Sequence, residues 1–536
     1  MLRKWPFHPF LVALYPVLAL LAANISQVEA IDALRAFVVS LVLALMLLAL
    51  FRLLLGDWPK AALLTSVTLV LFFSYGHVYS LLQGVLLGPV RIGRSAFLVP
   101  FWALVFLGFV AWLFRKQTRF EETHLLNLVG LILVALPVYG VVSYSVQSIR
   151  ARNSQKVEQP AALQTHFSGP APDVYYIVLD MHARTDVLRA FYGYDNSWFT
   201  EALRQRGFYI ADESTSNYSS TLQSIASSLN MEYVNNLEDQ YGADSNNREP
   251  LGLLLRQNQV FRSFQQAGYQ LGAFQTDDFY TEFRDLDHYL RPSPRDVREF
   301  QNPWTLNPFE GQLVHSSALR LLYDTRLVPE EIVQAETLET PYDLHRLTVL
   351  YALEHLPDFA HMDGSFFVFA HIVSPHPPYV FDREGGRLPH NRPYSLSAPG
   401  RQDGGAQVAK MYADQVDFID HEVLKSIDRI LARSDTPPII LLQGDHGPVS
   451  YYGEEEVRKS NMWEQHAILN AYYFPDGDYS RLYPSISPVN SFRALFNTYF
   501  GGSYELLADK NYFLMHARPY DFVDVTGRVK SDPHTP

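Results

Sequence analysis

The segment VYYIVLD, residues 174–180, decides the fold that we predict for most of this 536-residue chain. Six branched or aromatic residues stand between Pro172 and Asp180, a pattern typical of a strand that is buried on both faces of a parallel sheet. Similar runs occur at 366–370 (FFVFA) and 439–442 (IILL), with a weaker one at 268–274 (GYQLGAF). These runs predict several strands of one sheet.

Helical patterns separate the predicted strands. Directly before the strand at 439, apolar residues recur every three or four positions: Val416, Ile419, Val423, Ile427, Ile430 and Leu431. Strands that alternate with helices indicate an α/β domain with a mainly parallel sheet. We expect this domain to cover residues 171–536, with long insertions at 280–345 and 380–405 on its surface.

The first 150 residues have a different composition, which predicts a transmembrane domain. Five apolar stretches lie at about 9–25, 36–55, 61–82, 96–114 and 125–146, each close to the roughly 20 residues that cross a bilayer as a helix. The first is short enough for a signal peptide, but it contains Pro16 and no clear cleavage site, so we expect it to be retained. Residues 151–170 show no periodicity and are predicted to be a linker.

Basic residues predict the orientation of these helices. Seven lie on one side of the predicted spans (Arg3, Lys4, Arg52, Lys60, Arg115, Lys116 and Arg119), whereas three lie on the other (Arg35, Arg91 and Arg94). Loops rich in Lys and Arg stay in the cytoplasm. We therefore expect a multi-pass protein of the inner, cytoplasmic membrane, with its α/β domain in the periplasm or outside the cell.

Composition excludes several classes of function. The net charge of −13 argues against nucleic acid as a partner, because a polyanion is bound by clustered Lys and Arg. The chain has no cysteine, which excludes disulfides, thiolate zinc sites and a catalytic thiol.

Chemistry-bearing residues follow the predicted strands, at the sheet edge where α/β proteins bind ligands. Asp180 follows the first strand, His376 lies in SPHPPY, Asp445 and His446 form DHG with Gly447, and His466 stands in QHAILN. Each alone is explained by a helix cap, a turn or packing. Together they form a set of carboxylates and imidazoles suited to a divalent cation such as Zn²⁺ or Mn²⁺.

Hydroxyl groups precede a predicted helix in SNYSSTLQ, residues 216–223. Ser219, Ser220 and Thr221 stand where free backbone N–H groups and the helix dipole favour an anion. Without a metal, the segment is explained as a run of helix-capping residues. Beside a cation, one hydroxyl becomes a nucleophile toward phosphorus.

The order of these motifs resembles the alkaline phosphatase superfamily in its sulfatase-like branch. With five preceding spans, the chain is similar to the lipoteichoic acid synthases and the lipid A phosphoethanolamine transferases. The resemblance implies metal ligands at Asp180, Asp445 and His446, together with a Thr nucleophile that also binds the metal. This favours Thr221, although a strict count against the motif also selects Ser219.

The resemblance also implies catalytic roles for two histidines. His376 corresponds to a histidine that contacts the transferred phosphoryl group or the leaving group, and His466 corresponds to the histidine downstream of DHG. No C/S-x-P-x-R motif occurs around residues 219–224, which disfavours sulfate ester hydrolysis. We therefore expect a metal-dependent transferase that moves a phosphoryl-linked head group, of phosphoethanolamine or phosphoglycerol type, from a membrane phospholipid to an envelope glycan or lipid through a phospho-Thr intermediate. The alternatives are a membrane-anchored phosphatase or phosphodiesterase, and a non-catalytic envelope sensor or scaffold.

Overall fold

The computed structural model describes residues 5–26, 28, 30–82, 85–87, 90–91, 93–115, 120–154, 170–293, 295–297, 306–324, 339–390, 394, 396, 405–449 and 460–529. These residues form two compact units. The first contains residues 1–149, 301–341 and 390–394, and the second contains 150–300, 342–389 and 395–536.

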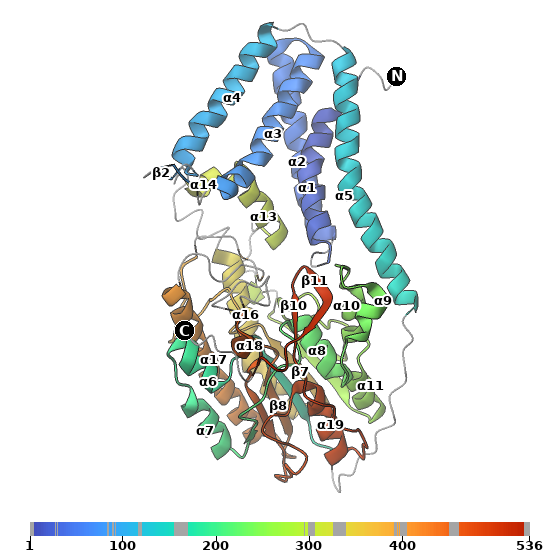
Figure 1. Cartoon of the computed structure of the whole chain (residues 1–536), viewed down its shortest axis with the longest axis vertical. Coiled ribbons are helices and arrows are strands. Elements are labelled where there is room, and N and C mark those ends of the chain that lie inside the picture. Colours follow the sequence, from blue (N-terminus) through green and yellow to red (C-terminus); the bar gives the residue numbers. More distant parts are fainter. Residues whose placement is uncertain are drawn as a thin grey trace. The chain divides into compact units, whose positions relative to one another are not determined.

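Apolar helices dominate the first unit (Figure 1). They are α1 (His8–Asn24), α2 (Leu34–Leu55), α3 (Trp58–Leu82), α4 (Ser95–Arg115) and α5 (Phe120–Ser154), with the short helix η2 (Ala30–Ala33) and the strands β1 (Leu86–Leu87) and β2 (Val90–Arg91) between them. Four stretches in α2 to α5 are long and apolar enough to cross a membrane, while α1, with 17 residues, is shorter. The chain therefore contains a membrane domain, and α5 continues through the first four residues of the predicted linker. The rest of that linker, residues 155–169, lies outside the described residues.

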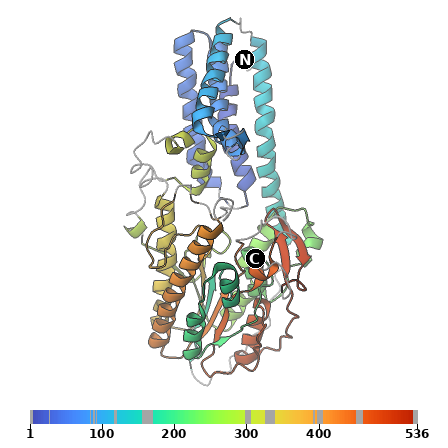
Figure 2. The ribbon, with the colours of Figure 1, turned by 60° about the vertical axis from the view of Figure 1, so that its left-hand side comes forward.

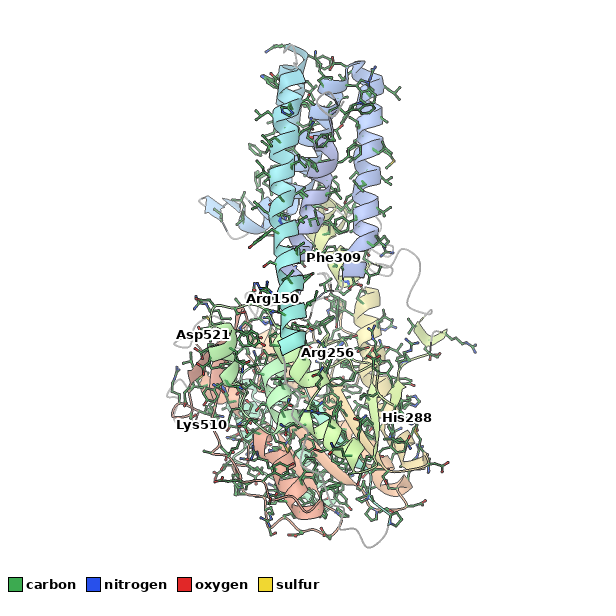
Figure 3. The ribbon with its side chains drawn as sticks, turned by 90° about the vertical axis from the view of Figure 1, so that its right-hand side faces the viewer. Arg150, Arg256, His288, Phe309, Lys510 and Asp521 are labelled. Atoms are coloured by element: carbon green, nitrogen blue, oxygen red, sulfur yellow. The ribbon has the colours of Figure 1, made fainter. Side chains whose placement is uncertain are left out.

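A segment from the predicted 280–345 insertion belongs to this membrane unit. It contains α13 (Pro308–Ser316) and α14 (Arg320–Asp324). Phe309, labelled in Figure 3, packs with apolar residues of α1 and α2. Arg35 forms an ion pair with Glu310, and the Ala318 N–H donates to the carbonyl of Phe72 at 2.7 Å. We had expected this insertion to lie on the surface of the α/β domain.

Gly76 in α3 permits a close approach of α13. A Cβ atom at position 76 would lie 2.3 Å from the carbonyl oxygen of His315. Any other residue would collide with backbone atoms, which cannot rotate away as a side chain can.

The second unit confirms the predicted α/β fold with a mostly parallel sheet. Its seven strands lie in the order β4 (Tyr209–Ile210), β9 (Asn470–Tyr473), β8 (Ile439–Gly444), β3 (Val174–Leu179), β7 (Phe366–Ile372), β5 (Gln270–Phe274) and β6 (His288–Leu290). β9 pairs antiparallel with both of its neighbours, β4 and β8, and the other strand pairs of this sheet are parallel. The four runs that predicted strands are β3, β5, β7 and β8. Because β3 pairs in parallel with both β7 and β8, it is a central strand, and all six of its residues are buried.

Helices cover both faces of this sheet (Figure 1). One core joins residues of β3 and β7 to α8 (Thr221–Asn230), α10 (Glu249–Arg256), α11 (Gln259–Gln266) and α19 (Pro488–Tyr499). The long helix α17 (Gly405–Arg433) runs along the other face (Figure 2). It buries Val416, Ile419, Val423, Ile427 and Ile430, as its periodicity predicts.

The remaining elements are short, except for the 17-residue helix α16. They are α6 (Thr185–Tyr192), α7 (Ser197–Gln205), α9 (Asn236–Tyr241), α16 (Glu339–His355), η4 (Leu356–His361), α18 (Met462–His466) and the antiparallel hairpin of β10 (Tyr512–Met515) and β11 (Arg518–Asp524).

Candidate metal and nucleophile site

Strand register brings two carboxylates together at one edge of the sheet. Leu179 of β3 pairs with Gly444 of β8, so the next residues, Asp180 and Asp445, emerge side by side. His446 completes a group whose possible ligand atoms all lie within 4.8 Å of one another. All three side chains are at most 4% exposed.

Gly447 lets the DHG turn pack closely against the following segment. Its N–H donates to the carbonyl of Gln465 at 2.7 Å, and a Cβ atom there would lie 2.0 Å from the carbonyl oxygen of Glu464. The glycine is therefore required by a close backbone approach, which keeps the ligand turn against α18.

The donor atoms of this group suit a divalent cation. Among described residues, nothing donates a hydrogen bond to Asp180 Oδ1 or Asp445 Oδ2, although both atoms are buried. His446 Nδ1 donates to the carbonyl of Gly447 at 2.8 Å, so the neutral imidazole has its lone pair on Nε2. Two buried carboxylate oxygens without hydrogen bonds beside an imidazole lone pair are costly unless a cation joins them.

The two carboxyl groups titrate differently because they share one buried site. Burial acts to raise the pKa of Asp180, but the nearby imidazoles of His376, His371 and His446 outweigh it and lower the pKa to about 2. Burial and the charge of Asp180 raise the pKa of Asp445. Charge in the pair therefore concentrates on Asp180 when no cation is bound.

Thr221 lies beside this group as the first residue of α8. Its Oγ1 is 3.2 Å from His446 Nε2. Ser220 is the N-cap and makes no side-chain capping bond, so the first-turn N–H groups and the helix dipole at this end favour an anion.

Ser219 has a different environment. Its hydroxyl accepts a hydrogen bond from the N–H of Leu514 at 3.3 Å, and its N–H donates to the carbonyl of Tyr512 at 3.2 Å. Ser219 is thereby attached to β10, whereas Thr221 faces the metal-ligand group.

The two other predicted histidines lie near the group but do not join it. His376 is half-buried, and its Nδ1 contacts the carbonyl of Pro377. His466 is fully buried, with Nδ1 3.1 Å from the carbonyl of Met462 and Nε2 3.4 Å from that of Tyr512. Burial lowers the pKa of His466 to about 4, so its imidazole is neutral at pH 7.

His371 is a site residue that the sequence analysis missed as a candidate. Its Nε2 lies 3.4 Å from Asp180 Oδ2, and Thr281 Oγ1 is 2.8 Å from its Nδ1. Burial opposes its protonation, but the hydrogen bond and charge of Asp180 outweigh burial and raise the pKa of His371. The sequence did contain a signal for His371, a histidine near the end of the buried strand FFVFAHI. This strand, β7, pairs with β3, and β3 leads directly into Asp180.

Comparisons with known proteins identify one family. The sulfatase family model matches residues 173–486, which is more than half of the chain. No curated protein matches the sequence.

Three solved structures are examples of the similarity in fold. The C-terminal periplasmic domain of EcEptC from Escherichia coli is 12% identical, with a TM-score of 0.43, over 71% of this chain and 98% of that one. Lipooligosaccharide phosphoethanolamine transferase A from Neisseria meningitidis is 12% identical, with a TM-score of 0.36, over 92% and 96%. Phosphonate monoester hydrolase of Agrobacterium radiobacter is 12% identical, with a TM-score of 0.35, over 64% and 80%. At TM-scores below 0.5, these likenesses do not assign a substrate.

Proposed function

This chain belongs to the sulfatase family, and from that premise we propose that it transfers a phosphoryl-linked head group from a membrane phospholipid to an envelope glycan or lipid. The observation that carries the proposal is the position of Thr221 Oγ1, 3.2 Å from His446 Nε2, next to two buried carboxylates. A hydroxyl, a metal-ligand group and a helix N-terminus at one point are the parts that a covalent phosphoryl transfer requires.

Asp180, Asp445, His446 and Thr221 would hold the cation. A set of two carboxylates, one imidazole and one hydroxyl suits Zn²⁺ or Mn²⁺. When bound, the ion lowers the pKa of the nucleophilic hydroxyl and neutralises negative charge that develops on the phosphoryl oxygens. Ser219 is disfavoured as the nucleophile because its hydroxyl is hydrogen-bonded to β10.

The reaction then consists of two displacements at phosphorus. Thr221 Oγ loses its proton to solvent and attacks, so that an Oγ–P bond forms while the bond from phosphorus to the glycerol oxygen of the lipid breaks. His376 gives its proton to that leaving oxygen, which yields diacylglycerol. The acceptor hydroxyl loses its proton to His376 and attacks the same phosphorus from the side opposite Thr221. The Oγ–P bond breaks, and Oγ takes back a proton from solvent to restore the Thr221 hydroxyl.

The membrane helices hold the α/β domain to a bilayer that contains the donor. The excess of basic residues on one side of the spans supports an extracytoplasmic position for this domain. Reporter enzymes fused after residue 155 should be active only outside the cytoplasm. A cytoplasmic reporter signal would contradict the proposed orientation.

Labelled phospholipids test the proposed reaction. The full chain in detergent is incubated, with Zn²⁺ or Mn²⁺, with phosphatidylethanolamine or phosphatidylglycerol that carries a labelled head group. We expect release of diacylglycerol and a peptide containing Thr221 whose added mass identifies the group. Release of the free head group at the same rate with or without an acceptor would establish hydrolysis instead. Neither diacylglycerol nor an adduct with either donor would refute the proposal.

A further inference from the structure

The turn that follows Asp180 has an unusual backbone conformation. Met181 has a φ of 63°, in the left-handed region that side chains other than glycine rarely adopt. Among the described residues, the only other non-glycine with positive φ is Met231, which is the C-cap of α8. The conformation at Met181 must therefore be imposed by its surroundings.

The hydroxyl of Tyr412, in α17, forms hydrogen bonds with this turn on both sides of His182. Its hydroxyl donates to the carbonyl of Met181 at 2.8 Å and accepts from the N–H of Ala183 at 3.2 Å. Burial raises the pKa of Tyr412 well above its usual value, so the hydroxyl keeps the proton that it donates. One fully buried side chain thus holds the two backbone groups that flank His182.

A second residue of α17 holds the side chain of His182. Asp420 Oδ1 lies 2.7 Å from His182 Nε2, and neither side chain is exposed. Asn196 Nδ2 donates to the other oxygen of Asp420 at 3.0 Å, which fixes the carboxylate in turn. The turn after Asp180 is therefore attached to α17 through its backbone and its side chain.

This turn determines which oxygen of Asp445 faces the metal-ligand group. The N–H of Met181 donates to Asp445 Oδ1 at 3.0 Å, and the N–H of His446 donates to the same oxygen at 2.8 Å. Both backbone hydrogen bonds thus go to Asp445 Oδ1, while Oδ2 accepts no hydrogen bond from described residues and is available to a cation. The φ of Met181 sets how the chain continues from this N–H, so the left-handed conformation lets one residue donate its N–H to Asp445 Oδ1 and present its carbonyl to Tyr412.

We propose that Tyr412 is a positioning residue, which holds Met181 in the left-handed conformation so that Asp180 and Asp445 each present an oxygen to a divalent cation. Residues that orient metal ligands commonly change metal affinity about 10- to 100-fold when they are replaced. The inference rests on the metal site proposed above. It adds that α17, which supplies none of the proposed ligands, sets the affinity of that site.

The test measures metal affinity on the full chain in detergent, with Zn²⁺ alone and Mn²⁺ alone in competition against a chromophoric chelator. Tyr412→Phe keeps the ring and removes only the hydroxyl, and we expect it to weaken binding of either ion by about tenfold or more. Tyr472→Phe is the matched control. Tyr472 is also fully buried and also has two hydrogen-bond partners, Ser491 and Gln443, so its loss should lower thermal stability without changing metal affinity.

A glycine substitution tests the role of the backbone. Because glycine adopts positive φ without strain, Met181→Gly should make the Tyr412 hydroxyl less necessary. In the presence of Met181→Gly, we expect Tyr412→Phe to weaken metal binding about threefold or less. An equal loss in both backgrounds would show that Tyr412 does not act through this turn.

The outcomes separate the two proposals. If the wild-type chain binds neither Zn²⁺ nor Mn²⁺, the metal site itself is refuted. If the wild-type chain binds and Tyr412→Phe binds equally well, the metal site stands and the positioning role is refuted. A loss that is equal in Tyr412→Phe and Tyr472→Phe would also refute it, because it would report general stability.

Discussion

Replacing Thr221 by alanine separates catalysis from folding and from metal binding. The Thr221 hydroxyl has one described hydrogen-bond partner, His446 Nε2 at 3.2 Å, and a hydrogen bond of this kind contributes about 1 kcal/mol to stability. Thr221 is also the first residue of α8, where alanine is well tolerated. We therefore expect Thr221→Ala to fold with a melting temperature within a few degrees of wild type.

The expected loss of activity is far larger. Without the hydroxyl no covalent intermediate forms, and removal of a nucleophile lowers turnover by about 10⁴- to 10⁶-fold, which corresponds to about 5 to 8 kcal/mol of transition-state stabilisation. Three metal ligands remain, Asp180, Asp445 and His446. Metal binding should weaken much less than activity. Thr221→Ser, which restores a hydroxyl, should recover turnover to within about tenfold of wild type.

Release of diacylglycerol from labelled phospholipid is the assay, and Ser219→Ala is the matched comparison. That variant removes the acceptor of the Leu514 N–H bond, at a cost of about 1 kcal/mol in stability. Its turnover should stay within a few-fold of wild type. Our assignment of the nucleophile would be refuted if Ser219→Ala abolished turnover while Thr221→Ala retained it. If neither change mattered, the covalent mechanism itself would be wrong.

Three other predictions concern the metal, the response to pH and the membrane unit. Asp445→Asn should lower Zn²⁺ affinity by at least about 100-fold in a chelator competition, whereas Asp428→Asn, in an exposed ion pair with Arg206, should bind as wild type. Burial raises the pKa of the Asp173 carboxyl to about 6. The folded state therefore holds this proton more tightly than the unfolded state does. The contribution of the protonated carboxyl to the free energy of unfolding is lost as the pH rises from about 4 through 6. Asp173→Asn should therefore nearly match wild type at pH 4 and exceed it by up to about 3 kcal/mol at pH 8 in thermal unfolding. An equal difference at both pH values would contradict this. Gly76→Val should displace α13 and increase tryptic cleavage at the largely buried Arg320 about tenfold or more, whereas Gly108→Val, with no atom within 4 Å of its added Cβ, should leave cleavage unchanged.

Local composition was sufficient to predict the sheet and most of the site. The strands β3, β7 and β8 are continuous apolar runs, and the residues at the ends of parallel strands meet at one edge. For this reason Asp180, Asp445 and His446 were expected to lie together, as they do. The apolar stretches of the first 150 residues were equally clear, because length and hydrophobicity alone define helices that can cross a bilayer.

Features that depend on contacts between distant segments were not predictable. The sequence could not distinguish Thr221 from Ser219, because the difference lies in the contact between Ser219 and Leu514, 295 residues away. His371 was hidden inside an apolar run, and its proximity to Asp180 follows from strand register. The packing of Phe309 against α1 and α2 was also missed, since a short helix in a polar insertion carries no signal of its partner.

The attachment of β10 to the nucleophile segment has a consequence for biosynthesis. A nascent chain that extends just past β8, through His446, already carries Asp180, Thr221 and Asp445 as well. It still lacks Tyr512 and Leu514, whose backbone groups hold Ser219 two residues before Thr221. The backbone contacts that hold Ser219, the residue before the N-cap of α8, therefore form only once the chain extends to β10. Under the proposed function, an unfinished polypeptide would lack these contacts beside Thr221 and would remain latent toward its substrate.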